Sequence, residues 1–278
     1  MMSTKRRKGK ATLLLTLLAA LATLLALAGS TYAWFTFRPY TNVTPLSGTV
    51  SGGEGSLLIC ASRDGEFKET CALSPADPGA ELLPISTADL SRFYAVKTQD
   101  PAGMALTYAQ AEDRAEKHTL RGSVYLKADG AAQEVYLWRD SLDCGRNAQA
   151  LASMRLGLVF HTAGGTKTYI FKLEELGSTD GAEKRATVPG SRQVVESISA
   201  AGAPTYTEDP ARTLSEFAAG GTAEEIKPGS RALCTLQRDE VARVDFRLYL
   251  EGCDENCVNA AQGRDIALRL GFAGISAG

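Results

Sequence analysis

The sequence has little of what enzymes commonly use for catalysis. Its 278 residues include only two histidines, His118 and His161. Neither histidine has a second ligand at zinc-site spacing, and no CxxC pair occurs. The H-E-x-x-H, G-x-S-x-G, G-x-G-x-x-G and P-loop patterns are all missing. The sequence therefore predicts a protein that is not an enzyme and has neither a cofactor nor a metal site.

An excess of positive over negative charge occurs only near the N-terminus. The formal net charge is −2, and the basic cluster Lys5-Arg6-Arg7-Lys8 with Lys10 precedes every acidic residue. The remaining chain is therefore mildly acidic, which gives no electrostatic basis for binding nucleic acid. Acidic and amide side chains do gather near the C-terminus, but without the spacing of an EF-hand, so an exposed acidic loop is expected there: Asp254, Glu255, Asn256 and Asp265.

A long apolar run exists only at the N-terminus, from Ala11 to Ala28. Basic residues precede it and Gly29-Ser-Thr-Tyr-Ala33 follows, which is the pattern of a secretory signal over residues 1–33. Thr31 and Ala33 occupy the two small-residue positions, so cleavage is predicted before Trp34. An uncleaved membrane anchor is the alternative, because a run of this length is at the low end for a membrane span. Cleavage is favoured because small residues end the run where a peptidase needs them.

Cleavage would expose an aromatic N-terminus containing Trp34, Phe35 and Phe37. Such a terminus favours association when it is left in water. The residues that follow, up to 55, are rich in Thr, Ser, Gly and Pro, so residues 34–55 are expected to form a linker or an edge strand. Trp34–Phe37 could add a strand to a neighbouring copy, or fold back onto its own domain. The sequence leaves both possibilities open.

Two C-terminal segments show the clearest strand pattern. Apolar residues alternate with polar ones over 241–251 and again over 266–272. Because strand side chains point to opposite faces with a period of two, each segment is expected to have one buried and one solvated face.

The remaining strand signals predict hairpins separated by irregular segments. Residues 123–127 and 134–138 are expected to form one hairpin, and residues 154–161 and 167–172 a second. Helical turns are expected at 86–94 and 147–152, and a long irregular insertion at 205–230. Hairpins with few helices predict a mainly β, antiparallel β-sandwich over residues 56–278.

All six cysteines follow the predicted cleavage position, which suggests three disulfides in an exported chain. Cys60 and Cys71 flank a turn, and Cys253 and Cys257 lie close together in the sequence. Proximity therefore favours these two pairs and leaves Cys144 with Cys234. Some of the cysteines could instead be buried thiols.

Two segments resemble a known family. Gly29-Ser-Thr-Tyr-Ala-Trp-Phe-Thr36 resembles the export motif of TasA/camelysin-type surface proteins, which a SipW-type signal peptidase processes. Leu250-Glu-Gly-Cys-Asp-Glu-Asn-Cys257 is similar to a segment of clostridial proteins with that signal, although Tyr249 stands where tryptophan is usual. The resemblance implies a jelly-roll-like sandwich, and a secreted or cell-surface protein of the biofilm matrix that forms homo-oligomers or fibres. The alternative is an envelope binding module for a glycan or protein, held in the membrane by residues 11–28.

Overall fold

The structure is a computed structural model of the whole chain. It describes residues 43–52, 56–73, 76, 81–99, 106–138, 148–173, 193–213, 218–219, 231–254, 256–257 and 266–277. The chain divides into two units, Met1–Arg38 and Pro39–Gly278, and all the described residues belong to the second. The expected signal helix, the cleavage position and the aromatic segment Trp34–Phe37 therefore lie outside the described residues.

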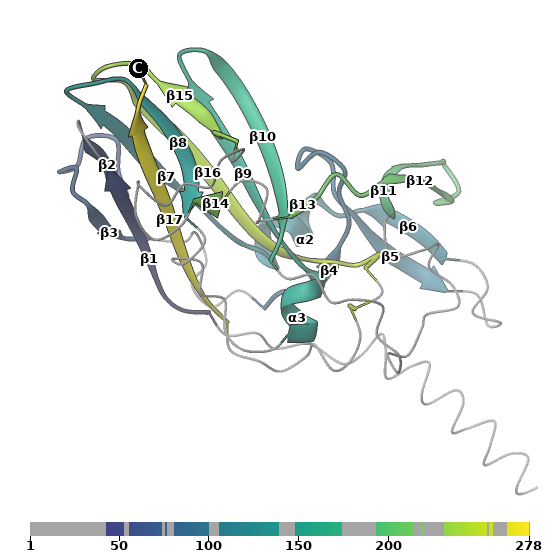
Figure 1. The fold of residues 1–278 in the computed structure, drawn as a ribbon. Helices are drawn as coiled ribbons and strands as arrows, with labels where there is room; N and C mark the ends of the chain where they lie inside the picture. Colours follow the sequence, from purple (N-terminus) through teal and green to yellow (C-terminus); the bar gives the residue numbers. More distant parts are fainter. Residues whose placement is uncertain are drawn as a thin grey trace, which may run out of the picture. The chain divides into compact units, whose positions relative to one another are not determined.

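Two β-sheets pack face to face and form a sandwich (Figure 1). In the first, the order is β14 (Ala218–Ala219), β8 (Gln133–Trp138), β17 (Ile266–Ser276), β1 (Val43–Gly52) and β3 (Thr70–Ala72), and β15 (Cys234–Leu236) also pairs with β8. In the second, it is β13 (Arg212–Thr213), β10 (Gly165–Lys172), β9 (Met154–Thr162), β16 (Val241–Glu251), β7 (Leu120–Asp129) and β2 (Ser56–Cys60), and β4 (Pro84–Ile85) joins β16.

Most neighbouring strands are antiparallel, and β1 is an exception because it runs parallel to β17. The predicted antiparallel β-sandwich is confirmed. Several successive strands, such as β1, β2 and β3 or β7, β8 and β9, pass from one sheet to the other, as in jelly rolls.

The main core lies between the sheets and follows the period-two pattern. Val244, Phe246 and Leu248 of β16 are buried there. Phe160 of β9 contacts Phe272 of β17 across the sandwich, with ring centroids 6.0 Å apart in an edge-to-face arrangement. The aromatic rings thus couple the two sheets directly.

One predicted hairpin is wrong and the other is confirmed. Residues 123–127 and 134–138 lie in β7 and β8, but β7 pairs with β2 and β16 whereas β8 pairs with β17 and β15 in the opposite sheet. Alternation identified both strands correctly, but it does not identify their partners. The hairpin of β9 and β10 forms as predicted, and α3 (Ala148–Ser153) supplies the predicted helical turn.

A second layer covers part of the outer face of the β16 sheet. It consists of α2 (Glu112–Lys117) and two hairpins, β5 (Tyr94–Gln99) with β6 (Leu106–Gln110) and β11 (Gln193–Ile198) with β12 (Pro204–Glu208). Residues 86–94 form bends and a β-bridge instead of the predicted helical turns. The predicted irregular insertion at 205–230 includes most of β12 as well as β13 and β14.

This layer corrects the prediction that one face of 241–251 is solvated. Tyr249 is buried, and the guanidinium of Arg247 lies 4.5 Å from the ring centroid of Phe93. Gly157 on β9 lies against the side chain of Leu90, which occupies the space that a Cβ atom at Gly157 would need. Only the N-terminal half of β16 keeps a solvated outer face.

Candidate functional site

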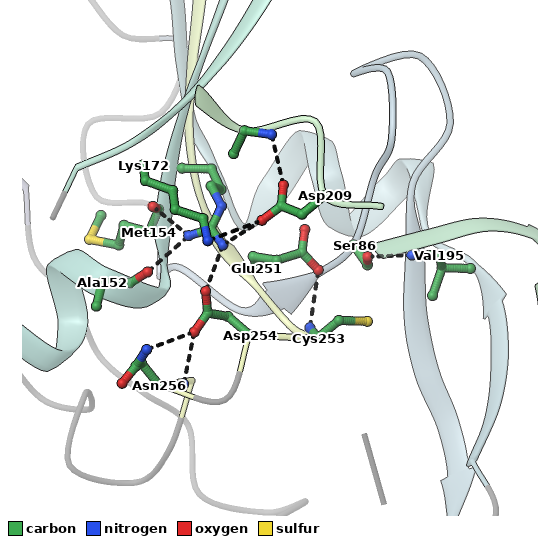
Figure 2. Close-up of polar contacts among 12 residues, drawn as sticks. Ser86, Ala152, Met154, Lys172, Val195, Asp209, Glu251, Cys253, Asp254 and Asn256 are labelled. Carbon is green, nitrogen blue, oxygen red and sulfur yellow. Dashed lines mark hydrogen bonds and ion pairs between the residues drawn. The ribbon is translucent and has the colours of Figure 1, made fainter. Parts of the chain in front are cut away.

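The most polar buried site is centred on Arg155, which is only 1% exposed. Figure 2 shows its partners Ala152, Met154, Asp209 and Asp254 gathered around this site. Arg155 Nη2 donates to Asp209 Oδ2 at 2.8 Å and to Asp254 Oδ2 at 2.6 Å. Its Nη1 donates to the carbonyl oxygens of Ala152 and Met154 at 2.9 and 3.1 Å. A single guanidinium thus connects the start of β9 to the segments that follow β12 and β16.

Asp209 and Asp254 also accept hydrogen bonds from groups other than Arg155. Asp254 Oδ1 accepts from the backbone nitrogen and the side-chain Nδ2 of Asn256 at 2.8 and 3.0 Å. Asp209 Oδ1 accepts from the backbone nitrogen of Ala211 at 2.9 Å, and Lys172 Nζ lies 3.7 Å from Asp209 Oδ2. Burial lowers the pKa of Arg155, but the two carboxylates outweigh this effect and hold that pKa above its usual value.

Glu251 is the third acidic residue of the site, and it too is buried. Its Oε1 accepts from the backbone nitrogen of Cys253 at 3.0 Å, while Oε2 has no hydrogen-bond partner. Burial raises the pKa of Glu251 to about 8, although Arg155 opposes the shift. Burial thus favours the protonated form of Glu251 in the folded chain.

The contacts of the Arg155 site hold separate segments of the chain together. Its cationic position is filled by a guanidinium, and no group of three or more metal-ligating side chains occurs among the described residues. Breaking a buried ion pair by removing one member costs about 3–5 kcal/mol, because the other charge is left buried and unpaired. The site therefore holds the loop after β16 and the segment after β12 against the sandwich.

A second polar group lies on the exposed outer face of the sheet, where Ser123, Asp245 and His161 come from adjacent strands. Ser123 Oγ and Arg243 Nε donate to Asp245 Oδ1, and His161 Nε2 lies 2.9 Å from Asp245 Oδ2. These are the residue types of a hydrolytic triad, but the carboxylate lies between the serine and the histidine. In a triad the histidine takes the serine proton directly, so this order cannot activate Ser123.

Hydrogen bonds determine the protonation state of Asp245. Burial raises its pKa, but the hydrogen bonds from Ser123, Arg243 and His161 outweigh burial and lower it overall. Asp245 is therefore a charged acceptor that joins three strands at their solvent side.

No disulfide forms among the cysteines that the structure describes. Cys60 is buried with its sulfur next to Gly65, whereas Cys71 packs against the main core. Cys253 lies among Tyr94, Tyr108 and Val195 in the second layer, and Cys257 lies in the main core. In each predicted pair the two side chains thus pack into different surroundings. Cys144 lies outside the described residues, so its pairing with Cys234 stays a prediction.

The acidic segment after β16 differs from the prediction. Asp254 and Asn256 are buried, although an exposed loop was expected, because Arg155 and the local turn bind their polar atoms. Sequence reasoning did not find Arg155 or Asp209 at all. The available signal was a lone arginine in the otherwise apolar stretch Met154-Arg-Leu-Gly-Leu158, which indicates a strand buried on both faces.

The predicted cleavage residues Thr31, Ala33 and Trp34 lie outside the described residues, and so does the predicted assembly segment of Trp34, Phe35 and Phe37. No helix in the described part of the chain is long and apolar enough to cross a membrane. Comparison with known proteins gives no match to a family model, to a curated protein or to a solved structure.

Proposed function

We propose that the chain is an exported, non-enzymatic structural protein of the cell surface or extracellular matrix, of the TasA/camelysin type. The observation that carries this proposal is an export-signal pattern, Lys5 to Ala33, placed ahead of a β-sandwich body. The polar clusters of that body support it further. Arg155 and Asp245 are each engaged by side chains of the chain itself, so both clusters act in holding strands together.

The first experiment determines the N-terminus of the protein recovered from cells and from the culture medium. Export with cleavage predicts a mature chain that begins at Trp34 and is found outside the membrane fraction. An intact Met1 in the membrane fraction would contradict this and support the alternative, an anchored envelope module that binds a glycan or protein. An Ala33→Lys variant should accumulate uncleaved, because the peptidase needs a small residue at that position.

The second experiment tests assembly. The mature protein is compared with the variant Trp34→Ser, Phe35→Ser, Phe37→Ser by light scattering and electron microscopy. Loss of assembly in the variant is expected, because the aromatic segment is proposed to dock on a neighbouring copy. Equal assembly of both proteins would rule out this segment as the contact. If neither assembles and only the variant loses stability, the segment folds back onto its own domain.

A further inference from the structure

Lys172, the last residue of β10, and Asp209, in the segment after β12, form an ion pair that is largely shielded from solvent. Lys172 Nζ lies 3.7 Å from Asp209 Oδ2, and the two side chains are 20% and 5% exposed. Lys172 stands directly opposite Arg155 in the ladder of β9 and β10, so both side chains project from the same face of the sheet. An amine and a carboxyl group from distant parts of the chain are thus held close together in a nearly buried position.

Hydrogen bonds to both of its oxygens fix the orientation of the Asp209 carboxyl group. Oδ1 accepts from the backbone nitrogen of Ala211 at 2.9 Å, and Oδ2 accepts from Arg155 Nη2 at 2.8 Å. Donors placed in this way stabilise the negative charge that develops on an oxygen when a nucleophile attacks the carbonyl carbon. The nucleophile beside this carboxyl group is the Lys172 amine.

Glu251 supplies a group that can give and take protons at this place. It is 1% exposed, and in the described part of the chain its Oε2 has no hydrogen-bond partner. Burial is the main cause of its raised pKa, and the negative charge of Asp209 adds to that shift, so the two carboxyl groups lie near each other. Figure 2 shows the Oε2 side of Glu251 facing Asp209, while Oε1 is turned to Cys253.

We propose that Lys172 and Asp209 join in an intramolecular isopeptide bond, with Glu251 carrying the protons. A proton first passes from the Lys172 ammonium to Asp209 Oδ2, which leaves an amine and a carboxylic acid. The amine nitrogen attacks Cγ of Asp209, and Glu251 gives its proton to Oδ2, which departs as water. Glu251 then takes one proton from the new amide nitrogen. The Nζ–Cγ bond forms, the Cγ–Oδ2 bond breaks, and one water molecule is the sole by-product.

The bond closes a covalent loop over residues 172–209, which contains the hairpin of β11 and β12. It therefore ties this hairpin of the second layer to β10 of the sandwich. A cross-link of this kind stabilises the folded chain mainly by limiting the freedom of the unfolded chain.

Mass spectrometry of the folded full-length chain, purified in detergent and reduced, tests for the bond. The parent should be lighter than its sequence requires by the mass of one water molecule. After digestion, the peptide that contains Lys172 should be covalently joined to the peptide that contains Asp209. Lys172→Met and Asp209→Ala should each have the full mass of their sequence. Circular dichroism of each variant confirms that it is folded before the masses are compared.

Two further variants separate this reaction from an unrelated loss of water. Asp209→Asn should be lighter by one ammonia molecule, because an amide releases ammonia where a carboxylic acid releases water. Lys127→Met is the control, since Lys127 Nζ lies only 2.6 Å from Asp129 Oδ1 but the two side chains are 30% and 45% exposed. An exposed ion pair remains solvated, so this variant should lose water as the parent does.

The role of Glu251 is tested by a rate. Unfolded chain is isolated from inclusion bodies in urea and diluted into refolding buffer, and its mass is followed with time. Glu251→Gln should form the bond about a hundredfold more slowly than the parent, an effect of the size expected when a general acid–base group is removed. Once its conversion is complete, this variant has the same cross-link as the parent, so the stabilities of the two can be compared directly.

Three results would overturn these assignments. A folded parent with the full mass of its sequence would show that Lys172 and Asp209 remain an ion pair. Water loss that persists in Lys172→Met, or that lies within a single peptide such as the one containing Asp64-Gly65, would show a dehydration elsewhere. Equal rates for the parent and Glu251→Gln would show that Glu251 does not carry the protons.

Discussion

Glu251 gives the protein a pH dependence whose sign follows from burial. The pKa of Glu251 is raised from 4.5 to about 8 in the folded state. Between these values the folded chain holds a proton that the unfolded chain has lost. Stability therefore falls as pH rises from 4.5 to 8, by at most about 1.4 kcal/mol per pH unit for one group.

The variant Glu251→Gln should remove this dependence, because glutamine keeps the acceptor for Cys253 N without a titrating proton. Urea unfolding between pH 5 and 9 measures it, and the variant should be more stable than the parent above neutral pH. The control is Glu69→Gln at an exposed position, which should leave the slope unchanged. A parent whose stability is constant over this range would contradict the buried, protonated state of Glu251.

Gln133 is a second residue whose burial carries a cost. It is fully buried, and neither its Oε1 nor its Nε2 has a hydrogen-bond partner. Replacing it by the similarly shaped methionine should stabilise the protein by about 1–2 kcal/mol, since an unsatisfied buried polar group costs that much. Thermal unfolding of Gln133→Met compared with the exposed control Gln237→Met measures the effect. Destabilisation by Gln133→Met alone would show that the amide makes contacts that matter.

The cysteine thiols provide a third test at this scale. Burial raises the pKa of Cys234 and of Cys253 to about 12, and only the thiolate is an efficient nucleophile. Alkylation of both should therefore be slow in the folded chain and fast in urea, as followed by mass spectrometry without reductant. If neither reacts even in urea, the disulfides predicted from the sequence are present.

At the scale of elements, β16 has a different environment at each end of its outer face. Arg247 donates to the carbonyl oxygen of Ala115 in α2 at 3.0 Å and lies over Phe93, whereas Arg243 is about half exposed and forms an ion pair with Asp245. Arg247→Ala should cost about 1–2 kcal/mol, because it removes a cation–π contact and a hydrogen bond. Arg243→Ala should change stability by at most about 1 kcal/mol.

Urea unfolding of Arg247→Ala and Arg243→Ala measures how much stability each variant loses. Phe246→Asp, on the inner face of the same strand, should abolish folding because it buries a charge among apolar side chains. Equal effects of Arg247→Ala and Arg243→Ala would show that the second layer contributes little to holding β16.

The elements also show how far sequence reasoning extends. Period-two alternation located β7, β8, β9, β10 and β16, and it predicted the inward residues of β16 such as Phe246. It could not assign β7 and β8 to different sheets, because alternation looks the same whether a strand's neighbour is sequential or distant. The residues of the Arg155 site were harder to predict from the sequence than the strands were. Arg155 meets Asp209 and Asp254 across 54 and 99 residues, and no local pattern encodes such contacts.

At the scale of the whole molecule, the second layer is built from insertions between sandwich strands. The hairpins β5–β6 and β11–β12 meet each other through Tyr108 and Tyr206, whose rings lie 6.2 Å apart edge to face. Ser86 Oγ accepts from the backbone nitrogen of Val195 at 2.9 Å and joins the second hairpin to the sandwich. The Arg155 cluster completes this attachment, so the sandwich and its second layer form a single folded unit.

The parallel pairing of β1 with β17 has a mechanical consequence. The pair runs from Val43 beside Ile266 to Gly52 beside Gly274, so the chain enters at one end of the pair and leaves at the other. A force pulling residue 43 and residue 276 apart would slide the two strands along each other. Their hydrogen bonds would then carry the load in shear and break together, whereas a hairpin pulled from its open end unzips one bond at a time. The pairing of β1 with β17 therefore places a set of hydrogen bonds loaded in shear at the point where these two strands meet.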